Sequence, residues 1–265
     1  MFPAGKNLLY NQYMKKFLFP LVLLLACPAA RAENDHVRIA QENAPAVVAV
    51  NVVKKDGSTF TGTGFAVAPE GLIATSRHVS DDALYMNITF NNGTVSGEAV
   101  TVASADEVDL SLLKIQALNL PTVRLADSDN VLPGQPITVI GNPRRLQNTI
   151  SSGLISQVRK KANGVIWHQI SAPISPSSSG SPVFNAQGEV ISVAFASYQG
   201  DGNQNLNFAV PSNYLVRLAS SAGYTLPQEE QTKPDTPPQA EGNPISNHFK
   251  KSWSILKRLL HLSEE

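Results

Sequence analysis

The chain has 265 residues, of which 42% are hydrophobic and 16% are charged. This length and this apolar content are enough for one large globular domain or two smaller ones, and they exclude an intrinsically disordered chain. The 21 basic and 21 acidic residues cancel, so the sequence lacks the positive excess by which nucleic-acid-binding proteins are recognised.

The beginning of the chain has the order of segments of a secretory signal. Two lysines come first, then an apolar run, then an A-x-A cleavage site; these are Lys15-Lys16, Phe17–Cys27 and Ala30-Arg31-Ala32. We therefore predict a signal peptide over residues 1–32, with Met14 as a second candidate for its first residue. Because the apolar run has about 11 residues and a membrane-spanning helix needs roughly 20, an uncleaved membrane anchor is the weaker alternative.

Cleavage after residue 32 would change the charge and the cysteine content. It would remove four basic residues and no acidic one, which leaves 17 basic against 21 acidic residues and a net charge of −4. It would also remove Cys27, the only cysteine, so the exported protein would be stabilised by its core without disulfide bonds. We predict a periplasmic or secreted protein, since a lipid anchor on Cys27 is disfavoured by the nearby Leu25 and Pro28.

From Pro45 to about Pro211 the sequence consists of short apolar or alternating runs separated by turn residues. About twelve such runs with almost no helical periodicity predict an all-β protein. Because twelve strands are too many for one small sandwich, we predict two antiparallel six-stranded β-barrels, joined by a crossover over residues 116–133. Short helices are expected over residues 35–43, before the first strand, and 212–220, after the last.

The composition changes at the end of the predicted folded domain, residues 33–225. Residues 226–245 contain five prolines and predict an extended linker. Residues 246–265 predict a basic amphipathic helix, whose apolar side chains at helical spacing are Phe249, Trp253, Leu256 and Leu260. Such a helix can lie on an anionic membrane surface, dock on its own barrel or self-associate, and these three alternatives stay open.

His78 is the first candidate site residue. It comes directly after two predicted strands joined by a Pro-Glu-Gly turn, in the sequence GTGFAVAPEGLIATSRHVS. The other four histidines lie beside the predicted cleavage site, inside a strand or in the tail; they are His36, His168, His248 and His261. A lone histidine after a strand is most often structural, so a role as a general base depends on an acid and a nucleophile elsewhere.

Asp109 is the candidate acid, because it opens the mostly apolar strand DLSLLKI. At a barrel end with little water around it, its carboxylate would need a hydrogen-bond donor such as a histidine N–H. A strand-capping acid is the alternative. The competing acids all lie in polar, turn-like stretches; they are Asp106, Glu107, Asp127 and Asp129.

The stretch ISPSSSGSPVF holds five serines, of which Ser179 precedes Gly-Ser-Pro and a predicted hairpin. A nucleophile on a tight turn before a hairpin can direct its own backbone N–H, and that of the residue two before it, toward one point, which forms an oxyanion hole. The remaining serines are interpreted as turn formers; they are Ser175, Ser177, Ser178 and Ser181.

Together these segments resemble the trypsin-like serine proteases, and more narrowly the HtrA/Deg type of bacterial envelope protease. That type has T-x-x-H-V, D-L-A-L-L-K-I, G-N-S-G-G-P and N-F-A-I-P. The corresponding segments here are TSRHV at 75–79, DLSLLKI at 109–115, SSSGSP at 177–182 and NFAVP at 207–211. Four motifs in the family's order, within a match over residues 36–220, are a specific signal.

The resemblance implies a chymotrypsin-like double barrel with polypeptide substrates. By it His78 is the general base, Asp109 the acid that orients it, and Ser179 the nucleophile that forms an acyl-enzyme. The oxyanion hole would consist of the backbone N–H groups of Ser177 and Ser179. No metal or organic cofactor is implied, because the mature chain has no cysteine and no histidine pair at ligand spacing. A homo-oligomer stays open.

Three features depart from the family or limit what it implies. Ser177 stands where the family usually has glycine, although a peptide that orients its N–H into the hole often needs a positive φ. The roughly 40 residues after the barrels are too few for the PDZ module of many HtrA proteases, which we expect this chain to lack. Pro173, six residues before Ser179, replaces the acid by which trypsin holds basic side chains, so we expect a preference for an uncharged, aliphatic residue.

Three functions are therefore compared. The leading hypothesis is an exported endopeptidase that cleaves unfolded or damaged envelope proteins through Ser179. The second is a catalytically silent peptide-binding or scaffold module with the same fold, suggested by Ser177 and the missing PDZ module. The third is an envelope tether that acts through residues 246–265, whose deletion would then abolish the role while Ser179→Ala would not.

Overall fold

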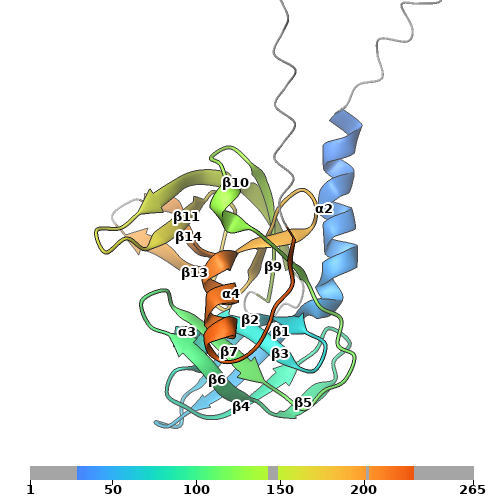
Figure 1. Cartoon of the computed structure of the whole chain (residues 1–265), viewed down its shortest axis with the longest axis vertical. Coiled ribbons are helices and arrows are strands. Elements are labelled where there is room, and N and C mark those ends of the chain that lie inside the picture. Colours follow the sequence, from blue (N-terminus) through green and yellow to red (C-terminus); the bar gives the residue numbers. More distant parts are fainter. Residues whose placement is uncertain (1–28, 143–148, 201–202, 230–265) are drawn as a thin grey trace, which may run out of the picture. The chain divides into compact units, whose positions relative to one another are not determined.

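The computed structural model describes residues 29–142, 149–200 and 203–229 (Figure 1). They lie in one compact unit that ends at Glu229. The predicted tail helix, most of the predicted linker and residues 1–28 of the predicted signal peptide lie outside the described residues.

The first half of this unit is a seven-stranded antiparallel sheet in the order β5-β4-β1-β2-β3-β7-β6 (Figure 1). The strands are β1 Val47–Lys54, β2 Thr59–Ala68, β3 Leu72–Ser76, β4 Ala83–Thr89, β5 Val95–Glu98, β6 Val100–Ala105 and β7 Leu110–Lys114. Only Ala99 separates β5 from β6, although they lie at opposite ends of the strand order. The sheet must therefore curl until its two edges approach each other.

The turn between β2 and β3 shows why a glycine is needed there. Gly71 has φ +98°, and a Cβ added to it would lie 2.4 Å from the carbonyl oxygen of Ile115. A hydrogen bond keeps the two residues together, since the backbone N–H of Ile115 donates to the Gly71 carbonyl at 3.0 Å. Only glycine combines this left-handed conformation with such a close backbone approach.

The second half is an eight-stranded sheet in the order β12-β9-β10-β11-β14-β13-β8-β15, in which β12 also pairs with β13. The strands are β8 Arg124–Ala126, β9 Pro136–Gly141, β10 Thr149–Lys160, β11 Ile166–Ile170, β12 Pro182–Phe184, β13 Glu189–Gly200, β14 Asn203–Pro211 and β15 Gln228–Glu229. The extra pairing closes six strands into a barrel, while β8 and β15 extend the sheet beside β13 in parallel. The predicted all-β double barrel is thus confirmed, with one curled and one closed sheet.

Two predicted segments differ in detail from the structure. The crossover over residues 116–133 contains a strand, β8, and a short 3₁₀ turn, Ser128–Asn130. The first residues of the predicted linker are packed on the domain, because Leu226 is buried and β15 pairs with β8.

In the described part of the chain, three α-helices accompany the sheets. Helix α4 spans Ser212–Ser221, close to the predicted 212–220. Helix α2 spans Ala29–Asn43, and so begins before the predicted residue 35. The third, α3 at Arg77–Ser80, is a single turn that the sequence did not predict. Within the described ranges, no helix combines the length and the hydropathy that crossing a membrane requires.

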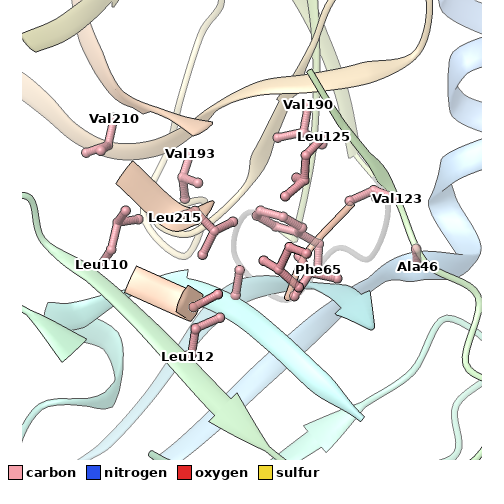
Figure 2. Close-up of a cluster of buried hydrophobic side chains, with 14 of the residues drawn as sticks. Ala46, Phe65, Leu110, Leu112, Val123, Leu125, Val190, Val193, Val210 and Leu215 are labelled. Carbon is pink, nitrogen blue, oxygen red and sulfur yellow. The ribbon is translucent and has the colours of Figure 1, made fainter. Parts of the chain in front are cut away.

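The largest apolar cluster joins the two halves of the unit (Figure 2). Phe65 comes from the first sheet, Leu125 and Val190 from the second, and Leu215 from α4, and all four are buried. Two further clusters fill the interiors of the first and second sheets separately. Strands β3 and β13 both contribute side chains to this common core, so they are held close to each other. The candidate site residues lie near this contact.

Candidate active site

His78 and Asp109 come from neighbouring strands of the first sheet. His78 lies in α3, directly after β3, and Asp109 directly precedes β7. The antiparallel pairing of β3 with β7 sets Ser76 opposite Leu110, so the two site residues emerge at the same end of the pair. The backbone N–H of Arg77 donates to the Asp109 carbonyl at 2.9 Å and extends this pairing by one step.

The Asp109 carboxylate makes two hydrogen bonds to His78. One oxygen lies 2.7 Å from the ring Nδ1, and the other accepts the backbone N–H of His78 at 2.9 Å. The Asp109 side chain is 23% exposed and that of His78 is 43% exposed. A carboxylate bound to Nδ1 fixes the tautomer of the imidazole and leaves Nε2 as the basic nitrogen.

The turn before Asp109 ends in a strained backbone conformation and is stabilised by a hydrogen bond and by ion pairs. Asp109 itself has φ +52°, a left-handed conformation that aspartate tolerates better than most residues. Its N–H donates to the Asp106 carbonyl at 3.2 Å. The Arg77 guanidinium forms ion pairs with Asp81 and Asp106, both at 2.9 Å, and so connects the helix that carries His78 to the turn that carries Asp109.

Ser179 lies on the loop between β11 and β12 of the second barrel, against the strand that leads to His78. The next residue, Gly180, has φ +88°. A Cβ there would lie 2.0 Å from the backbone carbonyl oxygen of Thr63, 2.4 Å from Thr75 Oγ1 and 3.0 Å from the backbone nitrogen of Ser76. This glycine therefore permits the serine loop to contact β2 and β3 directly. The Gly180 N–H donates to the Ala194 carbonyl at 2.7 Å, which holds the loop on β13.

The Ser179 hydroxyl donates to the Phe195 carbonyl at 3.4 Å. No hydrogen bond joins it to His78, although both residues are described. A distance of 3.4 Å is long for an O–H···O bond, so this contact is weak, and rotation about the Cα–Cβ bond of Ser179 would release it.

The backbone around Ser179 leaves two N–H groups without a partner among the described residues, those of Ser177 and Ser179. The N–H between them, of Ser178, donates to the Ser175 carbonyl at 2.9 Å. Ser177 has φ +74°, so the residue that stands in the family's glycine position does adopt a glycine-like conformation. An oxyanion hole requires backbone donors that are free of other partners and point toward one oxygen; these two N–H groups meet the first of these requirements.

Among the described residues, two of the competing histidines and one of the competing acids are engaged elsewhere. His168 lies inside the second barrel, where its Nδ1 is 2.5 Å from Ser192 Oγ, and burial lowers its pKa to about 4. His36 contacts Thr138 at 2.6 Å, and Asp127 caps the 3₁₀ turn by accepting the Asp129 N–H. In the described segments, no group of three or more His, Cys, Asp or Glu side chains is placed to hold a metal.

Two residues beside the site were not predicted. The only sequence feature that could have indicated a role for Arg77 is its position directly before His78. Thr63 contacts the serine loop through a hydrogen bond to Ser177, a residue 114 positions away in the chain. No local sequence pattern reveals a contact that depends on how two barrels pack.

Comparisons with known proteins match the part of the chain that carries these residues. A family model described as "Trypsin-like peptidase domain" matches residues 62–193, which include His78, Asp109 and Ser179. A protein of Marinomonas sp. named "Probable periplasmic serine endoprotease DegP-like" is 34% identical over 161 residues, 59% of this chain and 34% of that protein. The bovine "Serine protease HTRA2, mitochondrial" is 32% identical over 212 residues, 74% of this chain and 45% of that protein.

Solved structures of similar proteins share the fold. The HtrA-type protease AlgW with a tripeptide has a TM-score of 0.65 at 28% identity, over 70% of this chain and 62% of that one. A serine endoprotease from Yersinia pestis has a TM-score of 0.63 at 28% identity, over 71% of this chain and 66% of that one. The chain spans less than half the length of the two curated relatives.

Proposed function

Since the chain belongs to the trypsin-like serine peptidases of the HtrA/DegP type, we propose that it is a serine endopeptidase whose catalytic residues are His78, Asp109 and Ser179. One observation carries the proposal: the 2.7 Å contact between His78 Nδ1 and Asp109 lies beside the serine loop, whose Gly180 fits closely against Thr75 and Ser76. The proposal thus takes the base and the acid that orients it from the first barrel and the hydroxyl from the second.

In the proposed reaction Ser179 Oγ attacks the carbonyl carbon of the scissile peptide bond. The hydroxyl first rotates away from the Phe195 carbonyl, and its proton passes to His78 Nε2 as the new C–O bond forms. The protonated imidazole, stabilised by the Asp109 carboxylate, then gives this proton to the leaving amine as the C–N bond breaks. Water, deprotonated by His78, hydrolyses the acyl-enzyme and restores the Ser179 hydroxyl.

The negative oxygen of the tetrahedral intermediate would be stabilised by the N–H groups of Ser177 and Ser179. Both are backbone donors on a loop that several hydrogen bonds hold, so they need little reorganisation during the reaction. Removing one such donor lowers a rate by roughly 10²- to 10³-fold, which makes the orientation of the Ser177 peptide decisive for activity.

We further propose that the substrates are unfolded or damaged proteins of the bacterial envelope. Support comes from the predicted signal peptide over residues 1–32 and from relatives whose names place them in the periplasm. Pro173 in the loop that leads to Ser179 favours an uncharged, aliphatic residue before the cleaved bond. The predicted tail helix over residues 246–265 would lie on a membrane surface, dock on its own barrel or self-associate.

The second candidate function is a silent peptide-binding module of the same fold. It is favoured by one specific feature, the Ser179 hydroxyl that donates to Phe195 rather than to His78. The two functions differ in whether Ser179 is nucleophilic, which can be measured without knowing the substrate.

The test is covalent labelling of the purified protein with a fluorophosphonate, followed by peptide mapping of the modified residue. We expect the label on Ser179, and we expect at least a 10³-fold slower reaction in Ser179→Ala and His78→Ala, because a triad acts as a unit. Ser178→Ala is the matched control in the same run of serines and should keep most of the labelling. A folded protein that takes up no label, even with unfolded polypeptide present, would support the silent module instead.

A further inference from the structure

Thr63 is the one residue with a side chain in the segment Gly62-Thr63-Gly64 of β2. A Cβ at Gly62 would lie 2.6 Å from Val79, and one at Gly64 would lie 2.9 Å from Ile73, so the first barrel presses against one face of the strand here. Side chains alternate along a strand, and Phe65, two residues after Thr63, packs in the cluster between the barrels. Thr63 therefore faces the second barrel, and it is fully buried.

The Thr63 hydroxyl makes two hydrogen bonds to the second barrel. It donates to the Ser177 carbonyl at 2.8 Å and accepts the backbone N–H of Asn142 at 3.0 Å. An N–H can only donate. The Asn142 bond therefore leaves the hydroxyl proton free for Ser177 and fixes its direction.

The backbone of Thr63 makes a third contact to the same loop. Its N–H donates to the Ser179 carbonyl at 2.9 Å, while its own carbonyl accepts Thr75 Oγ1 at 2.7 Å. One residue of the first barrel thus holds the carbonyls of both Ser177 and Ser179. The peptide between these two carbonyls is fixed by the Ser181 N–H, which donates to the Ser178 carbonyl at 3.0 Å.

These contacts restrain the loop that presents the free N–H groups. A peptide is planar, so fixing the Ser178 carbonyl also fixes the Ser179 N–H on the opposite side. The Thr63 bond to the Ser177 carbonyl fixes the plane of the peptide that follows Ser177, so this residue, found at φ +74°, is anchored on its C-terminal side. A serine in this region is strained relative to glycine, so it needs an external partner more than the usual glycine would.

We propose that Thr63 is a positioning residue that holds the serine loop in the conformation in which the N–H groups of Ser177 and Ser179 converge. The proposal deepens the proposed function, on which its catalytic part rests. Its structural part, that the Thr63 hydroxyl orders residues 175–181, does not depend on activity.

The test compares three variants of the full chain. Thr63→Val keeps the shape and removes the hydroxyl, whereas Thr63→Ser keeps the hydroxyl. Thr61→Val is the matched control, because Thr61 lies two residues earlier on the same strand and bonds to Asn51 Oδ1 at 3.4 Å, away from the loop.

The first readout is hydrogen–deuterium exchange of peptides that cover residues 175–181, measured on wild type and on all three variants. A lost hydrogen bond corresponds to roughly a tenfold change in an opening equilibrium, so we expect about tenfold faster exchange in Thr63→Val. Thr63→Ser and Thr61→Val should exchange as wild type does. Unchanged exchange in Thr63→Val would overturn the proposal whether or not the protein is an enzyme.

The second readout is kcat and KM on a peptide substrate, normalised to the folded fraction. Because the N–H groups act on the transition state, Thr63→Val should lower kcat by roughly 10²-fold with little change in KM. Thr63→Ser should recover most of the rate. If the serine variant were as impaired as the valine variant, packing rather than the hydroxyl would be responsible and the proposal would be wrong. Faster loop exchange in Thr63→Val, with no turnover or labelling in wild type, would reject the proposed enzyme and keep the structural role of Thr63.

Discussion

Ser177 shows how one residue connects backbone strain to chemistry. At φ +74°, its Cβ is crowded in a way that glycine avoids, and the left-handed conformation costs an L-residue roughly 1–2 kcal/mol. The chain tolerates this strain because neighbouring hydrogen bonds over-determine the loop, as is common at functional sites. The N–H that the conformation presents belongs to the backbone, so the side chain at this position can change while the donor remains.

We predict that Ser177→Gly raises the free energy of unfolding by about 0.5–1 kcal/mol, since relief of the strain exceeds the larger entropy of an unfolded glycine. Activity should persist, because the N–H donor is unchanged. Ser175→Gly is the control in the same loop at a residue without a positive φ, and it should lower the free energy of unfolding. Urea denaturation of both variants measures the difference, and a Ser177→Gly protein that is less stable than Ser175→Gly would show that the serine is not strained.

At the scale of single elements, β11 carries a buried histidine whose protonation is linked to folding. His168 is 1% exposed, and burial lowers its pKa to about 4. It reaches across β14 to Ser192 on β13. An unfolded histidine has a pKa of about 6.5, so the unfolded state binds a proton at a pH where the folded state does not.

The sign of the effect follows from linkage. Below about pH 6.5 the unfolded state gains a proton first, so the free energy of unfolding falls as the pH falls toward 4, by up to about 1.4 kcal/mol per pH unit and roughly 3 kcal/mol in all. Above pH 7 this contribution is constant. His168→Gln cannot titrate, so denaturation at pH 7, 6 and 5 should show the wild type losing stability faster than the variant. Parallel curves for the two proteins would mean that burial does not lower the pKa of His168 in the folded protein.

Elements also show what the sequence could and could not predict. The strands, their turns and α4 were predictable because alternation, Gly turns and helical spacing are local signals. The one-turn helix α3 was not, since four residues carry too little periodicity, and its geometry comes from the Asp109 bonds to Arg77 and His78. The predicted site residues could be identified from motifs. The hydrogen bonds from Thr63 to the serine loop depend on how the two barrels pack, and no local sequence pattern predicts that.

For the whole molecule, the proposed site depends on the contact between the two barrels. His78 and Asp109 belong to the first and Ser179 to the second, and the shared cluster that includes Phe65, Leu125 and Leu215 keeps them together (Figure 2). Because each barrel also has its own core, the shared cluster decides whether the two unfold as one cooperative unit.

We predict that Leu215→Ala, at a fully buried position of α4 in this cluster, lowers the free energy of unfolding by about 2–5 kcal/mol. Labelling of Ser179 should be lost at the same denaturant concentration as the far-ultraviolet circular dichroism signal, because neither barrel keeps the site geometry alone. Leu118→Ala makes the same substitution at a position that is 86% exposed and should stay within about 0.5 kcal/mol of wild type. If Leu215→Ala instead unfolded in two steps, with labelling lost in the first, the barrels would be independent units, and the shared core would position the site without making the fold cooperative.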